Sequence, residues 1–126
     1  MKIFIMKNQL KENKLFLYGM AADQSAQIRS ITYWKEFLGI KVPVFTGSER
    51  IAKQHNIPVV FGEMKKVKRG FYKVFVDIIT EYPKKHKDFE ITDIFLKKVE
   101  KQIKEHPHLY FWTHNRFKHK DKAPKN

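Results

Sequence analysis

The pattern of hydrophobic and polar positions between residues 42 and 61 predicts a short helix followed by a buried strand. Thr46 precedes Glu49 by three residues, which is the spacing of a capping box, in which a hydroxyl and a carboxylate bond the free amides of a helix's first turn. We expect a helix from Thr46 or the next residue to Asn56, where an Ile-Pro pair stops it. The uninterrupted apolar run over residues 57–61 predicts a strand covered on both faces, inside an α/β sheet.

The first part of the chain predicts a helix and a second buried strand. Apolar residues at spacings of three and four over residues 2–12 are typical of an amphipathic helix. Residues 14–20 form a buried-strand run that leads into a polar loop over residues 21–25. Ligands collect at the carboxyl ends of strands in open α/β sheets, so Asp23 and Gln24 are candidates for a site. The alternative is that Asp23 only caps the turn through backbone amides.

Residues 26–41 carry an aromatic-rich patch, with Gly39 as a predicted turn. Such a patch is either part of the core or an apolar surface for an acyl chain or a membrane interface. We expect it to be core. Its members are Ile31, Tyr33, Trp34, Phe37 and Leu38.

An antiparallel hairpin is predicted between residues 57–64 and residues 71–79, which alternate in side-chain type. The connection over residues 63–70 is basic and closes with glycine, so its charges are expected at the tip of the hairpin. These charges are either a solvated turn or a clamp for anionic headgroups. The basic residues concerned are Lys65, Lys66, Lys68 and Arg69.

A polar linker over residues 82–88 precedes a second predicted helix. Thr92 or Asp93 is the expected cap, and Pro107 follows the end of the helix. The apolar stripe of this helix consists of Phe95, Leu96, Val99 and Ile103.

Length and charge limit the classes of partner. The 126 residues are enough for one domain with one core, which we place at residues 1–118, and the lysine-rich tail at residues 119–126 is expected to be disordered. Lys and Arg number 26 against 13 Asp and Glu, so the formal net charge is +13. This charge indicates an anionic partner, such as a phosphate-bearing lipid, a nucleic acid or an acidic carrier protein.

Several classes of site lack their sequence signals. The chain has no cysteine, which removes disulfides and thiolate metal sites. It has no apolar run of the roughly 18 to 20 residues that span a bilayer, and its first residues do not form a signal peptide. A GxGxxG loop, a Walker lysine and a GxSxG elbow are also absent.

Two weaker signals remain in the sequence. Residues 46–48 at a helix start offer free amides to one phosphate or carboxylate. Four histidines lie close together near the C-terminus, but no carboxylate or thiolate stands beside them at a diagnostic spacing, so we expect no metal site. These histidines are His106, His108, His114 and His119.

Five short segments, in a fixed order between residues 15 and 118, together match one pattern. They are Met20-Ala21-Ala22-Asp23-Gln24, Phe37-Leu38-Gly39, Thr46-Gly47-Ser48-Glu49-Arg50-Ile51-Ala52, Pro58-Val59-Val60, and His106-Pro107 with Trp112-Thr113-His114-Asn115-Arg116-Phe117-Lys118. In this order they resemble the carboxy-terminal half of the lipid A biosynthesis acyltransferase family, the late lauroyl and myristoyl transferases of Gram-negative bacteria. The fold class that follows is α/β, a mixed sheet flanked by helices, similar to the C-terminal part of the glycerolipid and lipid A acyltransferase fold.

The resemblance implies an enzyme that moves an acyl chain from acyl carrier protein to a hydroxyl of a phosphorylated, anionic lipid A precursor. It implies peripheral binding to the cytoplasmic face of the inner membrane and no cofactor. The family's general base is a histidine with Asp or Glu five residues later, and no histidine of this chain has one. We therefore expect a truncated family member, whether a broken gene, a mis-called start or a cloned fragment, that is inactive alone.

The resemblance also assigns site residues. Asp23 and Gln24 match the family's Asp-Gln loop near the active site, and we take them as the catalytic candidates. Residues expected to bind substrate by resemblance or by their helix-start position are Thr46, Gly47, Ser48, Arg50, Arg116 and Lys118. Lys65, Lys66, Lys68 and Arg69 are assigned by charge alone.

Two other classes of function stay open at this point. The net charge and the aromatic residues among Arg and Lys are also typical of a small nucleic-acid-binding module, although the aromatics cluster with aliphatic residues as a core would, so no nucleic acid is expected. A partner subunit is the third hypothesis, because a sheet cut through its middle leaves an edge for self-association or a complementing chain. The acyltransferase hypothesis requires residues 15–79 to form one sheet with Asp23 at a strand's carboxyl end.

Overall fold

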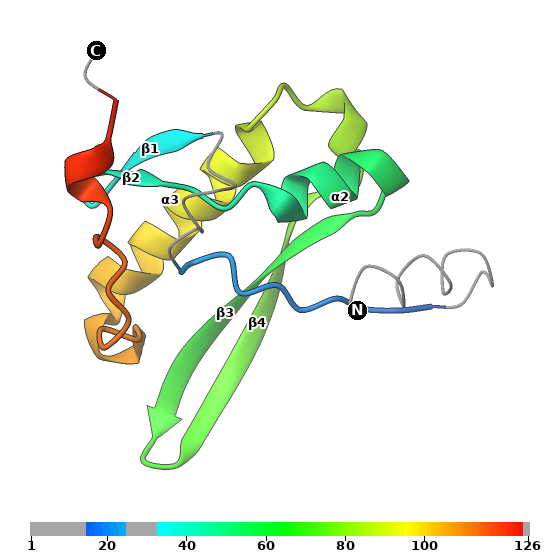
Figure 1. The fold of residues 1–126 in the computed structure, drawn as a ribbon. Helices are drawn as coiled ribbons and strands as arrows, with labels where there is room; N and C mark the ends of the chain where they lie inside the picture. Colours follow the sequence, from blue (N-terminus) through cyan, green and yellow to red (C-terminus); the bar gives the residue numbers. More distant parts are fainter. Residues whose placement is uncertain (1–14, 25–32, 125–126) are drawn as a thin grey trace.

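The computed structural model describes residues 15–24 and 33–124 and has mixed α/β architecture (Figure 1). The predicted helix over residues 2–12 lies outside the described residues. The strands and α-helices are β1 (Trp34–Phe37), β2 (Ile40–Pro43), α2 (Gly47–His55), β3 (Val59–Lys68), β4 (Phe71–Thr80) and α3 (Glu90–Glu105). Short 3-10 helices are η2 (Pro83–Lys85), η3 (Pro107–Leu109) and η4 (Lys120–Lys122).

The described strands form two antiparallel hairpins, β1 with β2 and β3 with β4, so the predicted single mixed sheet is wrong. Residues 15–20, expected as a buried strand, are not in a strand, and the Leu15 and Leu17 side chains are almost fully exposed. An apolar composition makes a strand only where another strand accepts its backbone hydrogen bonds. The two hairpins meet this condition locally, because each strand pairs with its neighbour in sequence.

The first hairpin turns tightly at Leu38 and Gly39, which have φ angles of 51° and 80°. Positive φ at both central residues suits a two-residue hairpin turn and favours glycine. Phe37, just before the turn, is fully buried. The predicted turn at Gly39 is therefore confirmed. The predicted core role of the aromatic patch is confirmed for Phe37, and Ile31 lies outside the described residues.

The second hairpin is longer than predicted, and Figure 1 shows it extending away from the other elements. Its antiparallel pairing confirms the predicted hairpin, with the turn at Arg69 and Gly70. The expected covering of both strand faces is wrong, because Phe61 is buried whereas Val60 is 40% exposed. Core side chains pack against one face only. Three of the basic residues also lie inside β3 rather than in the loop, namely Lys65, Lys66 and Lys68.

Helix α2 begins after Thr46 and ends at Asn56, whose left-handed conformation (φ 53°) closes it as predicted. The predicted capping box is wrong. Thr46 makes no side-chain bond to the helix, and Glu49 is buried with its carboxylate bonded to Thr92. Glu49 thus bonds Thr92 of another helix and does not cap the first turn of its own helix.

Helix α3 begins after Phe89, which has a left-handed conformation (φ 67°) and lies three residues before Thr92, the earlier of the two predicted caps. Neither Thr92 nor Asp93 is a cap. Thr92 donates a hydrogen bond to Glu49. Asp93 accepts hydrogen bonds from Lys35 Nζ in β1 (2.7 Å) and from Tyr33 Oη, just before β1 (2.9 Å). The side chains expected to start α3 therefore tie it to α2 and to the first hairpin.

The core lies where the first hairpin, the base of the second hairpin and one face of α3 meet. The predicted apolar stripe of α3 is confirmed, since Leu96, Val99 and Ile103 are buried and Phe95 packs against them. The buried cluster consists of Phe37, Val42, Val44, Phe61, Leu96, Val99 and Ile103. Disorder of residues 119–126 and self-association through an open strand edge stay predictions.

Candidate functional site

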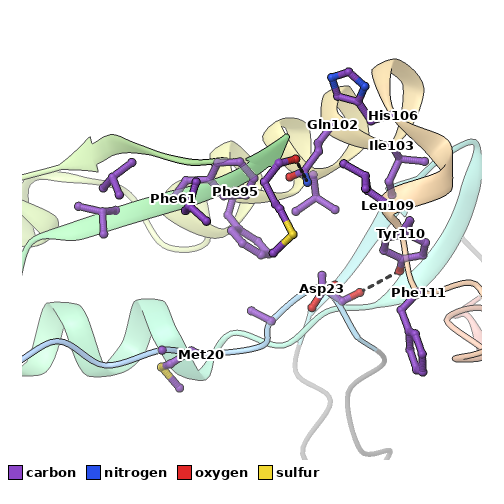
Figure 2. A pocket seen from close by; sticks show the side chains of 18 of the residues that line it. Met20, Asp23, Phe61, Phe95, Gln102, Ile103, His106, Leu109, Tyr110 and Phe111 are labelled. Atoms are coloured by element: carbon purple, nitrogen blue, oxygen red, sulfur yellow. Dashed lines mark hydrogen bonds between the residues drawn. The ribbon is translucent and has the colours of Figure 1, made fainter. Parts of the chain in front are cut away.

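An apolar cavity of about 530 Å³ lies between the segment over residues 17–23, the β3–β4 hairpin, α3 and η3 (Figure 2). Its lining consists of Leu17, Tyr18, Gly19, Met20, Ala22, Asp23, Val60, Phe61, Gly62, Met64, Val74, Val76, Phe95, Val99, Gln102, Ile103, His106, Leu109, Tyr110 and Phe111. Segments far apart in the sequence thus enclose one volume.

The α3 wall of the cavity follows from helical periodicity. Phe95, Val99, Gln102 and Ile103 recur at spacings of three and four, so they share one face of the helix. The Phe95 ring meets the Phe61 ring edge to face, with centroids 5.8 Å apart. This pair joins α3 to β3 at one end of the cavity and leaves apolar side chains along the rest.

Asp23 lies at the edge of this cavity, facing Tyr110 (Figure 2). The Tyr110 hydroxyl donates to the Asp23 carbonyl oxygen at 3.2 Å, which fixes the loop against η3. Burial raises the pKa of Tyr110, the Asp23 charge raises it further, and Arg116 opposes both. Gln24 follows as an exposed residue and is not part of the lining. The placement of Asp23 at a strand's carboxyl end is wrong, because residues 15–20 are not a strand.

A second, smaller cavity of about 170 Å³ is lined by Arg116 and shares Tyr110 with the first. The Arg116 side chain is 1% exposed, and its Nη1 donates to the Pro43 carbonyl oxygen at 2.8 Å. Burial lowers the pKa of Arg116, while the charges of Tyr110 and Asp23 raise it. The Nε and Nη2 atoms have no hydrogen-bond acceptor among the described residues. A buried guanidinium with two free donors is suited to an oxyanion such as carboxylate or phosphate.

The helix-start residues lie away from both cavities. Thr46 and Ser48 flank the first turn of α2, and neither is in a cavity lining. Gly47 has a packing role, since a Cβ there would stand 2.6 Å from Cζ of the Phe45 ring. The sequence pattern at this helix start therefore reflects packing of Phe45 as well as free amides.

The predicted basic residues do not converge on one site. Lys65, Lys66, Lys68 and Arg69 lie at the far end of the long hairpin, and Arg50 and Lys118 are exposed outside both cavity linings. Of the twelve predicted site residues, Asp23 lines the large cavity and Arg116 the small one.

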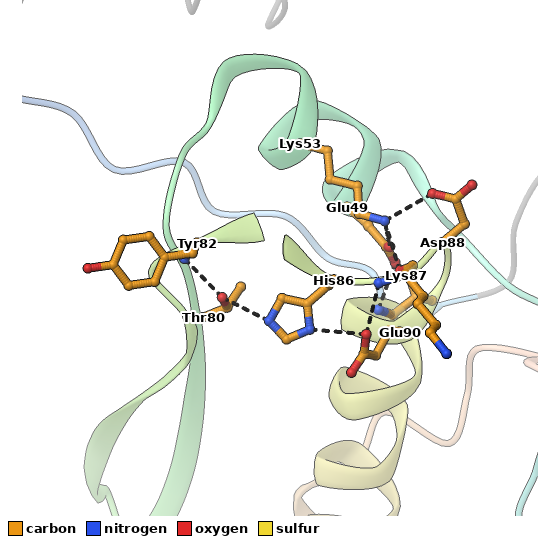
Figure 3. Close-up of polar contacts among 9 residues, drawn as sticks. Glu49, Lys53, Thr80, Tyr82, His86, Lys87, Asp88 and Glu90 are labelled. Carbon is orange, nitrogen blue, oxygen red and sulfur yellow. Dashed lines mark hydrogen bonds and ion pairs between the residues drawn. The ribbon is translucent and has the colours of Figure 1, made fainter. Parts of the chain in front are cut away.

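A polar cluster around His86 connects β4 to α3 (Figure 3). The ring places Nε2 3.0 Å from the Thr80 hydroxyl and Nδ1 3.3 Å from the Glu90 carboxylate. The Thr80 hydroxyl also accepts from the Tyr82 amide at 3.0 Å, it is buried, and it borders neither cavity. This arrangement fixes the chain between two elements. Within residues 15–24 and 33–124, no three His, Asp or Glu side chains are grouped to hold a metal ion.

Sequence reasoning missed the residues that give the cavity its shape. The stripe of α3 was predicted as core, and its partly buried Phe95 and buried Ile103 also form part of the cavity wall. Tyr110 had no signal in the sequence beyond its aromatic neighbours, because its contact with Asp23 joins residues 87 positions apart.

The fold and site define a small α/β domain with an apolar cavity bordered by an acidic loop. A family model described as bacterial lipid A biosynthesis acyltransferase matches residues 2–119. The chain belongs to this family, which confirms the resemblance found in the sequence. The family match stands although residues 15–79 do not form the one sheet that we expected of a family member. Curated proteins and solved structures gave no match. In the described part of the chain, no helix has both the length and the apolar character needed to cross a bilayer.

Proposed function

We propose that this chain provides the acyl-chain-binding part of an O-acyl transfer site. The donor is acyl carrier protein, and the acceptor is a hydroxyl of a phosphorylated lipid A precursor. The observation that supports this most directly is the apolar cavity with Asp23 at its edge, in a chain that belongs to the lipid A acyltransferase family.

The cavity has a suitable size and lining for an aliphatic chain. Its volume of about 530 Å³ falls within the range of about 300 to 1,000 Å³ usual for ligand pockets. Aliphatic and aromatic side chains from α3 and both strands of the long hairpin line it. Burying each methylene of a ligand in such surroundings contributes about 0.8 kcal/mol, so a chain of a dozen carbons has enough apolar surface to bind.

The polar groups lie at the Tyr110 side of the cavity. Asp23 and Gln24 are proposed to act on the reacting thioester end of the chain. The buried Arg116 and the exposed Lys118 are proposed to meet phosphate oxygens of the acceptor. In the transfer, the acceptor oxygen attacks the thioester carbonyl carbon, loses its proton to a base, and expels the thiolate, which takes up a proton. Donors that hold the carbonyl oxygen stabilise the negative charge that develops there.

The chain alone is proposed to lack transferase activity. The family's histidine and acid pair would remove the acceptor's proton, and none of the six histidines here has Asp or Glu five residues later. In the described residues His86 does meet Glu90, but its other nitrogen faces the buried Thr80 hydroxyl outside both cavities. Incubation with acyl carrier protein and lipid A precursor is expected to give no acylated product.

Binding of dodecanoate tests the proposal without requiring catalysis. Titration followed by tryptophan fluorescence is expected to saturate for the unaltered chain. Val76→Asn places an amide in the lining that a bound acyl chain would cover, and it is expected to weaken binding about fivefold or more, since an amide that loses its water without gaining a partner costs about 1–3 kcal/mol.

Ile78→Asn is the matched control for this titration. Ile78 is another exposed β-branched residue of β4, and it does not line the cavity. Its replacement is expected to leave the affinity for dodecanoate unchanged. Absence of saturable binding, or equal losses in the two variants, would contradict an acyl-chain site in this cavity.

A further inference from the structure

The outer part of the long hairpin, residues 64–75, exposes apolar side chains on both faces, and we call it the hairpin arm. Phe71 is 58% exposed and Val74 is 61% exposed. Every residue of β4 from 71 to 78 is exposed. Figure 1 shows the arm reaching beyond the rest of the described chain. The exposed apolar residues of the arm are Met64, Val67, Phe71, Tyr72, Val74 and Phe75.

A two-stranded ribbon of this kind is marginally stable in water unless something covers it. Scattered apolar residues on a surface need no explanation, but a contiguous patch marks an interaction surface. The arm combines both conditions. Its strands pair only with each other, and its exposed apolar side chains continue outward from Met64 and Val74, which stand opposite each other in the ladder and also line the cavity. Farther out, Tyr72 stands opposite Lys66 and Phe71 opposite Lys68. A covering partner therefore stabilises the arm.

The charge of the arm identifies the chemistry of that partner. Residues 64–75 contain five cationic side chains and no Asp or Glu. The carboxylates nearest in sequence are Glu63, which pairs with Lys65 at 3.3 Å, and Asp77, which pairs with Lys98 of α3. A second copy of the arm would bring like charges together, so a partner with negative charge fits better. The cations are Lys65, Lys66, Lys68, Arg69 and Lys73.

We propose that the hairpin arm docks on an anionic lipid surface, with its apolar side chains in the headgroup boundary and its cations on the phosphates. Lysine side chains whose stems lie beside apolar side chains at an exposed surface are suited to such an interface. Lys68 Nζ lies 4.4 Å from the Phe71 ring centre and Lys65 Nζ lies 5.3 Å from the Phe75 ring centre.

A lipid surface fits the arm better than a nucleic acid does. Single-stranded nucleic acids are held by aromatic rings on which bases stack. Two of the arm's rings already carry a lysine ammonium over a face, and much of the remaining apolar surface is aliphatic, as at Val67 and Val74. Aliphatic side chains offer no stacking surface to a base, whereas they gain from burial among acyl chains.

Co-sedimentation with vesicles tests the charge requirement. The protein is expected to bind vesicles of phosphatidylcholine mixed with phosphatidylglycerol, to bind phosphatidylcholine alone much less, and to be released by salt. The triple variant Lys65→Gln, Lys66→Gln, Lys68→Gln is expected to bind about a hundredfold more weakly, since each cation contributes roughly fivefold. The matched control Lys97→Gln, Lys101→Gln, Lys104→Gln removes the same charge from exposed positions of α3 and is expected to retain most of the binding.

A second pair of variants tests the apolar requirement and guards against misfolding. The double variant Val67→Ser, Phe71→Ser is expected to bind vesicles more weakly while its near-ultraviolet circular dichroism stays native. The control Leu15→Ser, at an exposed position outside the arm, is expected to leave vesicle binding unchanged. Equal binding to both vesicle types, equal losses in the two charge variants, or displacement from vesicles by a single-stranded oligonucleotide that binds the arm more tightly would overturn the proposal. The arm and the acyl-chain cavity are tested by different variants, so either proposal can fail alone.

Discussion

Glu49 of α2 accepts two hydrogen bonds from Thr92 of α3, one from the backbone N–H at 2.9 Å and one from the hydroxyl at 2.5 Å. Both residues are buried. Thr92 lies in the first turn of α3, whose N-cap Phe89 makes no side-chain cap bond. Glu49 therefore supplies from another helix the acceptor and the negative charge that a helix N-terminus requires.

Replacing Glu49 with alanine is expected to destabilise the fold by about 2–3 kcal/mol, because a buried N–H and a buried O–H lose a charged acceptor. Thr92→Val keeps the N–H bond and is expected to cost less, about 1–2 kcal/mol. Urea unfolding followed by far-ultraviolet circular dichroism measures both changes. The exposed Glu81→Gln is the control and is expected to stay within about 0.5 kcal/mol of the unaltered chain. A Glu49→Ala loss no larger than the control's would contradict this role.

Acid is expected to destabilise the protein through two carboxylates. The bond from Lys98 lowers the pKa of Asp77 below its ordinary value of 3.8, and the Lys87 N–H with His86 lowers that of Glu90 below 4.5. A folded pKa below the unfolded one gives stability that is complete above the ordinary values and is lost as the pH falls through the folded values. Asp77→Asn with Glu90→Gln is expected to make the unfolding free energy less dependent on pH in this acid range. An unchanged pH dependence of the urea midpoint would count against both pairs.

Arg116 is expected to stabilise the fold and to bind an oxyanion. Arg116→Met keeps most of the side-chain length but removes the bond to the Pro43 carbonyl, at a cost of about 1.5–3 kcal/mol. Inorganic phosphate is expected to raise the melting temperature of the unaltered chain and of the control Lys120→Met, at an exposed position outside both cavity linings, and not that of Arg116→Met. The same phosphate effect in Arg116→Met would show that the anion binds elsewhere.

Tyr110→Phe tests whether the hydroxyl positions the Asp23 loop. Loss of the 3.2 Å bond to the Asp23 carbonyl is expected to cost about 0.5–1.5 kcal/mol and to speed amide exchange in residues 20–24. Exchange in β1 and β2 is expected to stay unchanged, which separates a local effect from global destabilisation. Uniform acceleration across the chain would contradict the local role.

Local signals in the sequence predicted the parts of the fold that depend on neighbours along the chain. The stop at Asn56, the turn at Gly39, the long hairpin and the stripe of α3 each depend on residues a few positions apart, and all are confirmed. The capping predictions failed where a polar side chain had a better partner elsewhere, as Glu49 and Thr92 do in each other. The single mixed sheet failed because residues 15–20 are not in a strand and the two described hairpins form separate sheets.

The candidate site was predictable only in part for the same reason. The resemblance pointed to Asp23 and Arg116, which line the two cavities that share Tyr110. The resemblance could not indicate that Lys65 and its basic neighbours lie on a separate arm, because the sequence gives the charge of each residue but not its distance from the cavities. The contact of Tyr110 with Asp23 depends on how η3 packs, and no local pattern encodes it.

The most direct test of the account is a nuclear magnetic resonance titration of the nitrogen-labelled chain with dodecanoate. Saturable shifts are expected for the amides of Asp23, Gly62, Ile103 and Tyr110, which surround the cavity from four segments, with small changes at α2. No shifts at these amides, or shifts confined to the hairpin arm, would contradict the assignment of this cavity to an acyl chain.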